Sequence, residues 1–268
     1  MDIRNCRVLV TGASSGIGRG IAQALKKEGC LVAGTSRNPE AIPEAKRIPG
    51  VSYYQLELSD FKSIDRLVAD VGDVDILINN AGVSQIGAVE DTSLHQLRYI
   101  MEVNVVGTIY LTKLLLPGMR ERRKGFILNI TSFASIIAVP FSTLYAVTKH
   151  AIAGLSKGLW QEMRDYGVDV VSVAPVHVKT NIPMIRTSAE DSPHAAEITR
   201  VKAMRDKGML EAPEPDCIAK KVLKILKSRR PAPSYVVGNN AWLYWVLDKT
   251  MSKAAILRLV RRTFKVDG

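Results

Sequence analysis

The sequence predicts an α/β protein built on a parallel, doubly wound sheet of about seven strands, with helices on both faces. Three observations support this class. Short β-branched runs alternate with amphipathic stretches of helical periodicity. A glycine-rich turn follows the first run, and a chain of 268 residues at 47% hydrophobic content can bury one large core. We therefore expect a single domain over residues 1–240 and a basic amphipathic helical extension over residues 241–268.

Each predicted strand is a short apolar run of ordinary strand length. The runs are Arg7–Thr11, Leu31–Ser36, Val51–Glu57, Ile76–Asn79, Phe126–Ile130, Val168–Ala174 and Tyr235–Val237. Helical periodicity occupies Ile17–Lys27, Phe61–Val71, Leu94–Leu116, Leu144–Met163 and Cys217–Lys227. Strands joined through helices pair in parallel, because the helix returns the chain to the same end of the sheet. Residues 181–215 show neither pattern, and an irregular stretch of that length in a compact domain is usually functional.

The first predicted strand leads directly into Thr11-Gly12-Ala13-Ser14-Ser15-Gly16-Ile17-Gly18. A strand, a glycine turn and a helix present the amides of the helix N-terminus to a pyrophosphate, and glycine lets the backbone approach the phosphates. The spacing G-x-x-x-G-x-G differs from the G-x-G-x-x-G of the standard dinucleotide fingerprint. A plain tight turn is the alternative, which the position at the first strand–helix junction disfavours. We predict cofactor contacts from Gly12, Ser14, Ser15, Gly16, Ile17 and Gly18.

A phenol and an ammonium group, Tyr145 and Lys149, lie one turn apart in a predicted helix, with Ser132 upstream. Residues i and i+4 share one helix face. A phenol with an ordinary pKa of about 10 is a poor acid–base group near neutrality, and a neighbouring cation lowers that pKa. The pair by itself arises often by chance, so its weight depends on the motifs around it.

Those motifs occur in a familiar order. They are Thr11-Gly12-x-x-x-Gly16-x-Gly18, Asn79-Asn80-Ala81-Gly82, Asn104, Ser132, Tyr145-x-x-x-Lys149 and a segment from Pro175 to Thr180. On these residues the chain resembles the short-chain dehydrogenase/reductase family over nearly its whole length. The resemblance implies a Rossmann-type fold, a nicotinamide cofactor and interconversion of a carbonyl with an alcohol. It also implies homodimers or homotetramers through the two longest predicted helices.

The same resemblance assigns four catalytic roles. Tyr145 is the acid–base residue, and Ser132 donates a second hydrogen bond to the carbonyl. Lys149 lowers the pKa of the tyrosine and holds the nicotinamide ribose, while Asn104 holds a water that links Lys149 to solvent. Each has a plainer alternative, such as a turn hydroxyl or a solvated charge, and all four being incidental is improbable.

Cofactor choice is predicted from the end of the second strand, where Ser36 stands in place of an acid and Arg37 follows. A guanidinium pairs with a 2′-phosphate, so NADP(H) is preferred over NAD(H). The alternative is an ordinary surface arginine. The resemblance also places Glu57 and Leu58 at the adenine.

The resemblance places the rest of the cofactor site further along the chain. Asn80, Ala81 and Gly82 lie under the adenosine ribose, and Pro175, Val178 and Thr180 lie at the carboxamide and pyrophosphate. Val176 replaces the glycine usual after Pro175 and resists a positive φ, so we expect a differently shaped loop. For His177 an exposed loop histidine is favoured over a substrate contact.

The basic excess of the chain is a C-terminal property. From Cys217 onward there are twelve Lys or Arg and two acids, a net charge of +10 out of +11 for the whole chain. Over Lys253–Lys265, helical winding places the basic residues on one face and apolar residues on the other. Such a helix lies on an anionic membrane or packs on its own subunit or a partner, and both alternatives stay open. Nucleic acid is the least favoured partner because no nucleic-acid module is present in the sequence.

The three cysteines, Cys6, Cys30 and Cys217, are scattered, which predicts neither a disulfide framework nor a metal site. They are expected to be small buried residues. The first predicted strand begins at once and no apolar run spans a bilayer, so we expect neither a signal peptide nor a membrane helix. The expected location is cytoplasmic, with a peripheral membrane association through the C-terminal extension if that helix faces lipid.

The substrate is predicted from the irregular stretch, residues 181–215, whose flexible apolar side chains suit an apolar, adaptable pocket. They include Ile182, Met184, Ile185, Met204, Met209 and Leu210. A lipophilic ketone or secondary alcohol of steroid, retinoid or long-chain lipid type is the first choice, in line with the family members that carry similar C-terminal extensions. A 3-oxoacyl thioester reductase is the second enzyme class, and a non-catalytic NADP(H)-binding sensor or scaffold is the alternative of another kind.

Overall fold

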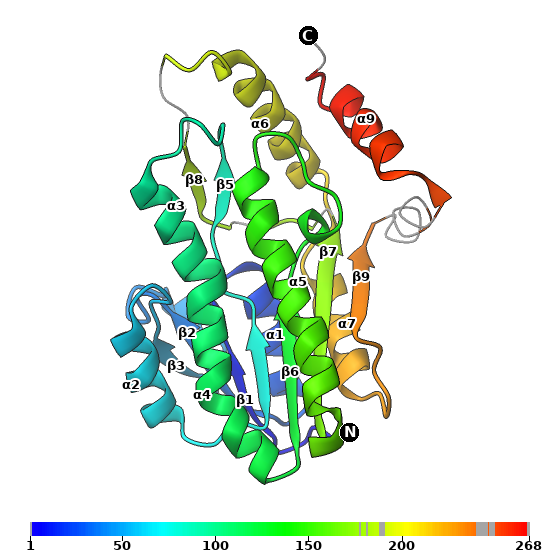
Figure 1. Ribbon diagram of the computed structural model, residues 1–268. Helices are drawn as coiled ribbons and strands as arrows, with labels where there is room; N and C mark the ends of the chain where they lie inside the picture. The colour runs from blue at the N-terminus through cyan, green and yellow to red at the C-terminus, as the bar shows by residue number, and fades with distance from the viewer. Residues whose placement is uncertain are drawn as a thin grey trace.

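The computed structural model describes residues 2–176, 178–180, 182–187, 191–239, 246 and 250–266. These residues form a seven-stranded sheet between two layers of helices (Figure 1). In spatial order the strands are β3 (Ser52–Gln55), β2 (Leu31–Ser36), β1 (Arg7–Val10), β4 (Ile76–Asn79), β6 (Gly125–Ile130), β7 (Val168–Val176) and β9 (Ser234–Gly238). All neighbouring strands pair in parallel. The predicted fold class is therefore confirmed. The predictions on His177, Asn181 and most of residues 241–249 lie outside the described residues.

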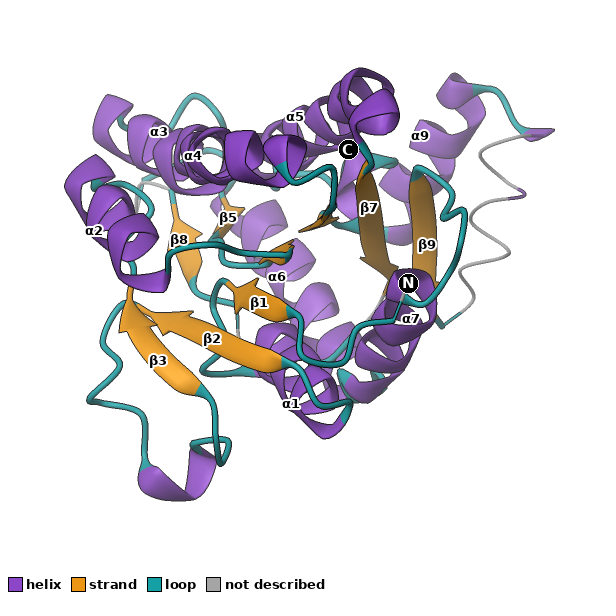
Figure 2. Cartoon of the chain, turned by 90° about the horizontal axis from the view of Figure 1, so that it is seen from below, coloured by secondary structure: helices purple, strands orange, loops and turns teal. Residues whose placement is uncertain are grey.

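The helices divide between the two faces of the sheet (Figure 2). One face carries α2 (Phe61–Val71), α3 (Leu94–Met101), α4 (Gly107–Glu121) and α5 (Thr143–Met163), and the other carries α1 (Gly16–Lys27) and α7 (Asp216–Leu226). This division follows from the period-2 alternation of strand side chains. In β1, Val8 and Val10 pack in the core that contains Ile21 of α1 and Val222 of α7. The residue between them, Leu9, packs in the opposite core with residues of α2 and α4.

Residues 181–215 are structured, in contrast to the predicted irregular loop. β8 (Met184–Arg186) pairs in parallel with β5 (Ser84–Ile86) in a second, two-stranded sheet, and α6 (Ala195–Leu210) follows. Both lie beyond the carboxyl ends of the main strands (Figure 1). The sequence conceals α6 because its apolar stripe is narrow: Ile198 and Val201 are its buried residues. They pack against Ile86 and Ala88, so the helix is stabilised by distant segments and not by its own pattern.

The C-terminal helix α9 (Lys253–Thr263) packs partly on its own subunit. Its N-cap is Ser252, whose hydroxyl accepts a hydrogen bond from the amide of Ala255. Ile256 is buried, and Phe264, just beyond the helix, packs on the cluster that contains Ile198 and Val201. Leu257 and Leu259 remain 49% and 47% exposed. The apolar side predicted to face a membrane is thus divided between an internal contact and solvent.

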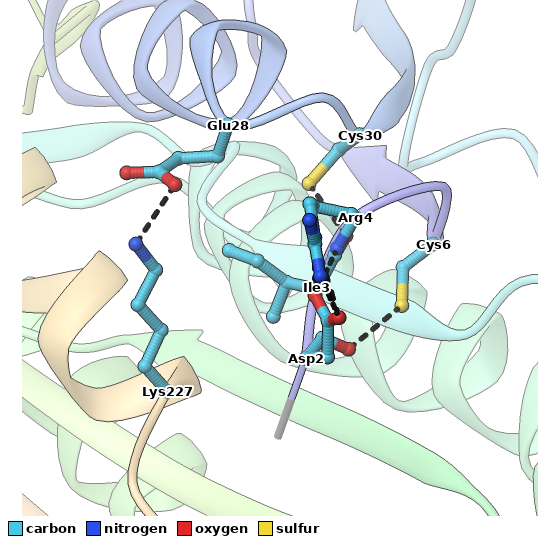
Figure 3. Close-up of polar contacts among 7 residues, drawn as sticks. All are labelled: Asp2, Ile3, Arg4, Cys6, Glu28, Cys30 and Lys227. Atoms are coloured by element: carbon cyan, nitrogen blue, oxygen red, sulfur yellow. Dashed lines mark hydrogen bonds and ion pairs between the residues drawn. The ribbon is translucent and has the colours of Figure 1, made fainter.

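Two of the three cysteines hold the N-terminal segment in place (Figure 3). The thiol of Cys30 donates to the carbonyl of Ile3 at 3.2 Å, and that of Cys6 to the carbonyl of Asp2 at 3.7 Å. Burial raises the pKa of Cys30 to about 11 and also raises the pKa of Cys6, so both are unreactive thiols. Beside them, Lys227 of the segment after α7 pairs with Glu28 of the segment after α1 at 2.8 Å. The predicted buried role is confirmed for Cys6 and Cys30, whereas Cys217 is half-buried.

One helical stretch, Leu94–Glu121, is long and apolar enough by composition to cross a membrane, in contrast to the prediction of none. Half of its most apolar window is buried inside the protein. Its α4 part packs against α2 and the sheet, where Leu111 is fully buried. These contacts account for its hydrophobicity as that of a core helix.

Candidate active site

The turn between β1 and α1 is an open cradle of the shape that a pyrophosphate needs. Gly12 and Gly16 have φ angles of +67° and +54°, a region that favours glycine. A Cβ at Gly18 would lie 2.2 Å from the carbonyl oxygen of Gly12, so only glycine lets the helix approach the turn. The N-cap, Ser15, makes no side-chain capping bond, which leaves the first amides of α1 to a ligand. These features fit the diphosphate of a dinucleotide.

The segment Asn79–Gly82 lies directly against this cradle. A Cβ at Gly12 would lie 3.1 Å from the Cα of Ala81. The side-chain amide of Asn80 donates to the carbonyl oxygens of Thr11 at 2.9 Å and Gly12 at 3.3 Å. Asn80 therefore shapes the turn with its side chain, which leaves the backbone of Ala81 and Gly82 to approach a ribose.

Tyr145, Ser132 and Lys149 are brought together at the end of β6. Ser132 follows β6, and its oxygen accepts from the amide of Ala134 at 3.1 Å. The hydrogen of this hydroxyl is then free to be donated, and Ser132 lies close enough to Tyr145 to lower its pKa. Lys149 is buried, donates to the carbonyl of Ile130 at 3.1 Å and lies 5.7 Å from the centre of the Tyr145 ring.

The electrostatics of this group differ from the prediction that Lys149 lowers the pKa of Tyr145. Burial raises the pKa of Tyr145, and the hydrogen bond from Ser132 and the charge of Arg205 oppose that rise. Burial lowers the pKa of Lys149 to about 8. The ammonium group of Lys149 donates to the carbonyl of Ile130 and lies 5.7 Å from the centre of the Tyr145 ring. Burial thus disfavours the charged form of Lys149, and the pKa of Tyr145 is shifted by burial, Ser132 and Arg205 rather than by Lys149.

Asn104 lies at a π-helical turn, Glu102–Val106, inserted between α3 and α4. Such turns occur often at functional sites. Its side-chain amide donates to the carbonyl of Val83 at 2.8 Å and to the hydroxyl of Thr148 at 3.1 Å, and its carbonyl accepts from the amide of Val83 at 2.8 Å. A Cβ at Gly82 would lie 2.9 Å from that carbonyl oxygen and 3.8 Å from the Lys149 ammonium. Asn104 is therefore close to Lys149, and its side chain joins the Val83 segment to Thr148 of α5. That Asn104 holds a water stays a prediction.

At the adenine end, Arg37 is exposed just beyond β2, and no ion pair to it is found among the described residues. Ser36 accepts from the amide of Asn38 at 3.3 Å. The carboxylate of Glu57 accepts from the amide of Ser59 at 3.1 Å and from its hydroxyl at 2.8 Å. Glu57 thus shapes the turn after β3, and the buried Leu58 packs in the core, with its carbonyl close to Gly107.

The segment after β7 approaches the glycine cradle. The Cβ of Thr180 lies 4.0 Å from the position of a Cβ at Gly16, and Val178 is buried. Pro175 and Val176 are the last residues of β7, which is longer than predicted. Val176 is absent from the residues with positive φ, and the glycine at this place is in the neighbouring strand instead: Gly238 has φ +133° and would carry a Cβ only 2.0 Å from the carbonyl oxygen of Val176. Gly238 of β9 thus packs closely on the end of β7, and the predicted reshaping of the loop after Pro175 stays a prediction.

Arg205 of α6, which sequence reasoning did not single out, lies at the candidate site. Its guanidinium donates to the hydroxyls of Ser142 at 2.6 Å and Ser84 at 3.1 Å, and to the carbonyl of Gln85 at 3.3 Å. Burial raises the pKa of Tyr145, and the charge of Arg205 opposes that rise. An arginine in a helix with a weak apolar pattern looks like an ordinary surface residue, and only the packing of α6 brings it to the tyrosine.

Comparison with known proteins identifies the family of this chain. The family model described as short chain dehydrogenase matches residues 7–191. The chain therefore belongs to the short-chain dehydrogenase family, whose members are oxidoreductases that bind a nicotinamide cofactor.

Individual relatives agree. The chain is 35% identical to the dehydrogenase/reductase SDR family member 7B of Bos taurus over 71% of its own length and 63% of that protein's length. It therefore spans less than two thirds of that relative. It is 28% identical to a 3-ketodihydrosphingosine reductase of Bacteroides thetaiotaomicron over 96% of this chain and 97% of that one. A crystal structure of a short-chain dehydrogenase from Streptomyces avermitilis superposes with a TM-score of 0.82 at 33% identity, covering 98% of this chain and 99% of that one.

Proposed function

We propose that this protein is an NADP(H)-dependent carbonyl reductase or alcohol dehydrogenase that acts on a lipophilic ketone or secondary alcohol. One observation carries the proposal: Tyr145 and Ser132 lie together beside the buried Lys149, at the carboxyl end of the sheet that also carries the glycine cradle. A proton donor, a second hydrogen-bond donor and a dinucleotide site are the groups that reduction of a carbonyl requires.

Tyr145 acts as the acid in the reductive direction. Because burial raises its pKa, the phenol is protonated at neutral pH and can donate to a carbonyl oxygen. Ser132 donates to the same oxygen, since its own oxygen is already oriented by the amide of Ala134. Lys149 restores the proton, because a pKa of about 8 lets it exchange protons near neutrality. The nicotinamide, when bound, supplies the hydride.

NADP(H) is the preferred cofactor because Arg37 presents a guanidinium beyond β2 with no acid at Ser36. A 2′-phosphate forms charge-assisted hydrogen bonds with such a group. The remaining cofactor contacts come from the cradle, from Ala81 and Gly82, and from the Pro175–Thr180 segment.

A lipophilic substrate is supported by the apolar residues near the site. Ile185 of β8 packs in the same core as Tyr145, whereas Leu210 is 76% exposed and does not contribute to a pocket. A hollow of about 480 Å³ opens immediately before α5, lined by Ala88, Val89, Pro140 and Phe141 among others. The name of the Bacteroides relative, a ketone reductase, supports the reductive direction. A 3-oxoacyl thioester reductase is the second candidate, and its substrate also carries a long apolar chain.

A homodimer is the proposed assembly. The outer faces of the long helices expose Val106, Ile109 and Val147 at 42%, 38% and 46%. Between α4 and α5, an apolar hollow of about 200 Å³ is lined by Ile109, Leu116, Leu155 and Leu159 among others. Association through these two helices would bury this surface.

The C-terminal helix is proposed to touch an anionic membrane from the cytoplasmic side. The exposed Leu257 and Leu259 are interleaved with the exposed Arg258, Arg261 and Arg262. Interleaved leucines and arginines favour contact with acidic headgroups.

The test is oxidation of NADPH by the purified protein with a panel of long-chain ketones, 3-oxoacyl thioesters and small carbonyls, followed at the nicotinamide absorbance. We expect turnover with the long-chain compounds. Binding of NADPH without turnover of any carbonyl would instead support the sensor or scaffold alternative.

A further inference from the structure

Arg205 introduces a positive charge on the substrate side of the catalytic tyrosine. It lies in the helix α6, which covers the carboxyl end of the sheet (Figure 1). Its hydrogen bonds reach Ser142, three residues before Tyr145, and Ser84 and Gln85 of β5. Positions three apart at the start of a helix share a face, so the guanidinium and the phenol lie on the same side of α5.

The charge of Arg205 is not neutralised by its hydrogen-bond acceptors. All three are neutral oxygens, and the residues that supply them are buried. The carboxylate next in sequence, Asp206, contributes at longer range and is paired with Lys202. The three bonds use three of the five N–H groups that a guanidinium carries, so it has donors left for a ligand.

We propose that Arg205 is a specificity-determining residue, which selects substrates that carry a carboxylate or another accepting oxygen near the reacting carbonyl and rejects substrates that carry an ammonium group there. This inference rests on the proposed function, which it narrows: the lipophilic substrate has an oxygenated or anionic head next to its ketone. An incompletely paired cation attracts an oxyanion through charge-assisted hydrogen bonds and repels a like charge. A long-chain 3-oxo acid or thioester fits this requirement, and an amino ketone does not.

The first experiment measures binding without turnover. Decanoate and decylamine have the same chain and opposite head charges, and their dissociation constants are measured with NADP⁺ bound to the full chain. We expect decanoate to bind more tightly to the wild type, and Arg205→Met to reduce the decanoate-to-decylamine preference by about tenfold or more, the range of charge-assisted hydrogen bonds. Arg205→Lys should keep the larger part of the preference.

Lys207→Met is the matched control, because it removes the same charge from an exposed position of the same helix. An equal loss of preference in both variants would overturn the proposal, since it would reflect net charge alone. An unchanged preference in Arg205→Met would overturn it as well. If Arg205→Met fails to bind NADP⁺, Arg205→Gln replaces it, because it keeps hydrogen-bonding groups without the charge.

The second experiment separates this inference from the proposed function. The wild type and Arg205→Met are assayed with NADPH on a 3-oxo acid, its methyl ester and an amino ketone of equal chain length. A loss of discrimination between the acid and the amino ketone supports the role of Arg205. Turnover of all three with the same ratio in both proteins would refute the inference and leave the reductase proposal intact. No turnover in either protein would refute the reductase proposal, and the binding measurement would then decide on Arg205 by itself.

Discussion

The glycine cradle and the α6 region both contribute to the candidate active site, but they are built in different ways. The cradle uses a short continuous segment, Gly12–Gly18, whose glycines are required by φ angles and by contacts under 3 Å. The α6 region joins pieces that are far apart in sequence: Arg205 is bonded to Ser142 across 63 residues and to Ser84 across 121. The first region has a sequence signature, whereas the second exists only once the chain is folded.

This difference indicates which part of the protein fixes the chemistry and which part fixes the substrate. The glycine cradle is a local motif within one short segment. The position of α6 depends on distant segments, because its apolar stripe is too narrow to specify that position alone. Both regions adjoin Tyr145. We expect substitutions in one region to have effects that can be measured separately from those of substitutions in the other.

The largest effect is expected at the meeting point. Tyr145→Phe removes the proton donor but keeps the ring and its packing, so turnover should fall by about 10²–10⁴. Binding of NADPH, measured by fluorescence, should stay near that of the wild type. Near-normal turnover in this variant would contradict the assigned mechanism, and Tyr166→Phe, the same change at an exposed position outside the site, is the control.

In the cradle, Gly18→Ala places a methyl group 2.2 Å from the carbonyl oxygen of Gly12. We expect a loss of about 1–3 kcal/mol in the free energy of unfolding, together with weakened NADPH binding. Gly154→Ala is the matched control, because a Cβ there meets no atom within 4 Å. This control should be neutral or stabilising by up to about 1 kcal/mol, since alanine favours a helix interior. Equal effects of the two changes would contradict a tightly built cradle.

Lys149 predicts how stability depends on pH. Its pKa falls from 10.5 to about 8 on folding, so the unfolded chain binds more protons between these values and this contribution to stability increases with pH. Lys149→Met removes that dependence. The wild type should therefore gain about 2 kcal/mol relative to the variant between pH 8 and pH 10, measured by urea unfolding. A constant difference over this range would mean that the lysine stays fully charged in the folded protein.

At the adenine end of the cofactor site, Arg37→Asp should weaken NADPH binding relative to NADH binding by about tenfold or more, because a carboxylate repels the 2′-phosphate. Dissociation constants for both nucleotides measure this ratio. Arg47→Asp, at another arginine outside the proposed site, should leave the ratio unchanged. A ratio that is equal in wild type and Arg37→Asp would refute the preference for NADP(H).

The smallest effect on catalysis is expected in the C-terminal helix α9, which contributes no residue to the candidate site. The double change Arg258→Glu and Arg262→Glu should weaken binding to anionic vesicles by about 1 kcal/mol per charge. Substitution is preferable to deletion of α9, because Ile256 and Phe264 are part of the packed structure. Lys27→Glu with Lys220→Glu changes the net charge equally on α1 and α7. Equal vesicle binding by the two double variants, or none by the wild type, would contradict a membrane contact through α9.

The strand pattern and the motifs predicted most of the fold. β2 and β4 have the predicted bounds, and α2 matches its predicted helix. The errors have physical causes. Leu94–Leu116 was predicted as one regular helix, but a π-helical turn interrupts it at Asn104. A π-helical turn contains one more residue than an α-helical turn, and the hydrophobic periodicity of the sequence does not reveal this insertion. Residues 181–215 were predicted to be irregular, but α6 forms there because distant segments with Ile86 and Ala88 stabilise it.

The sequence by itself determined the layered sheet, the glycine cradle and the pairing of Tyr145 with Lys149, because each depends on local periodicity or on residues within two helical turns. Only the tertiary structure decided the electrostatics of the site. Whether a group is desolvated, and which charges face it, depends on elements brought together from across the chain. For this reason the charge of Arg205, which comes from α6, opposes the burial-induced rise in the pKa of Tyr145 although the sequence did not indicate that the two residues are close.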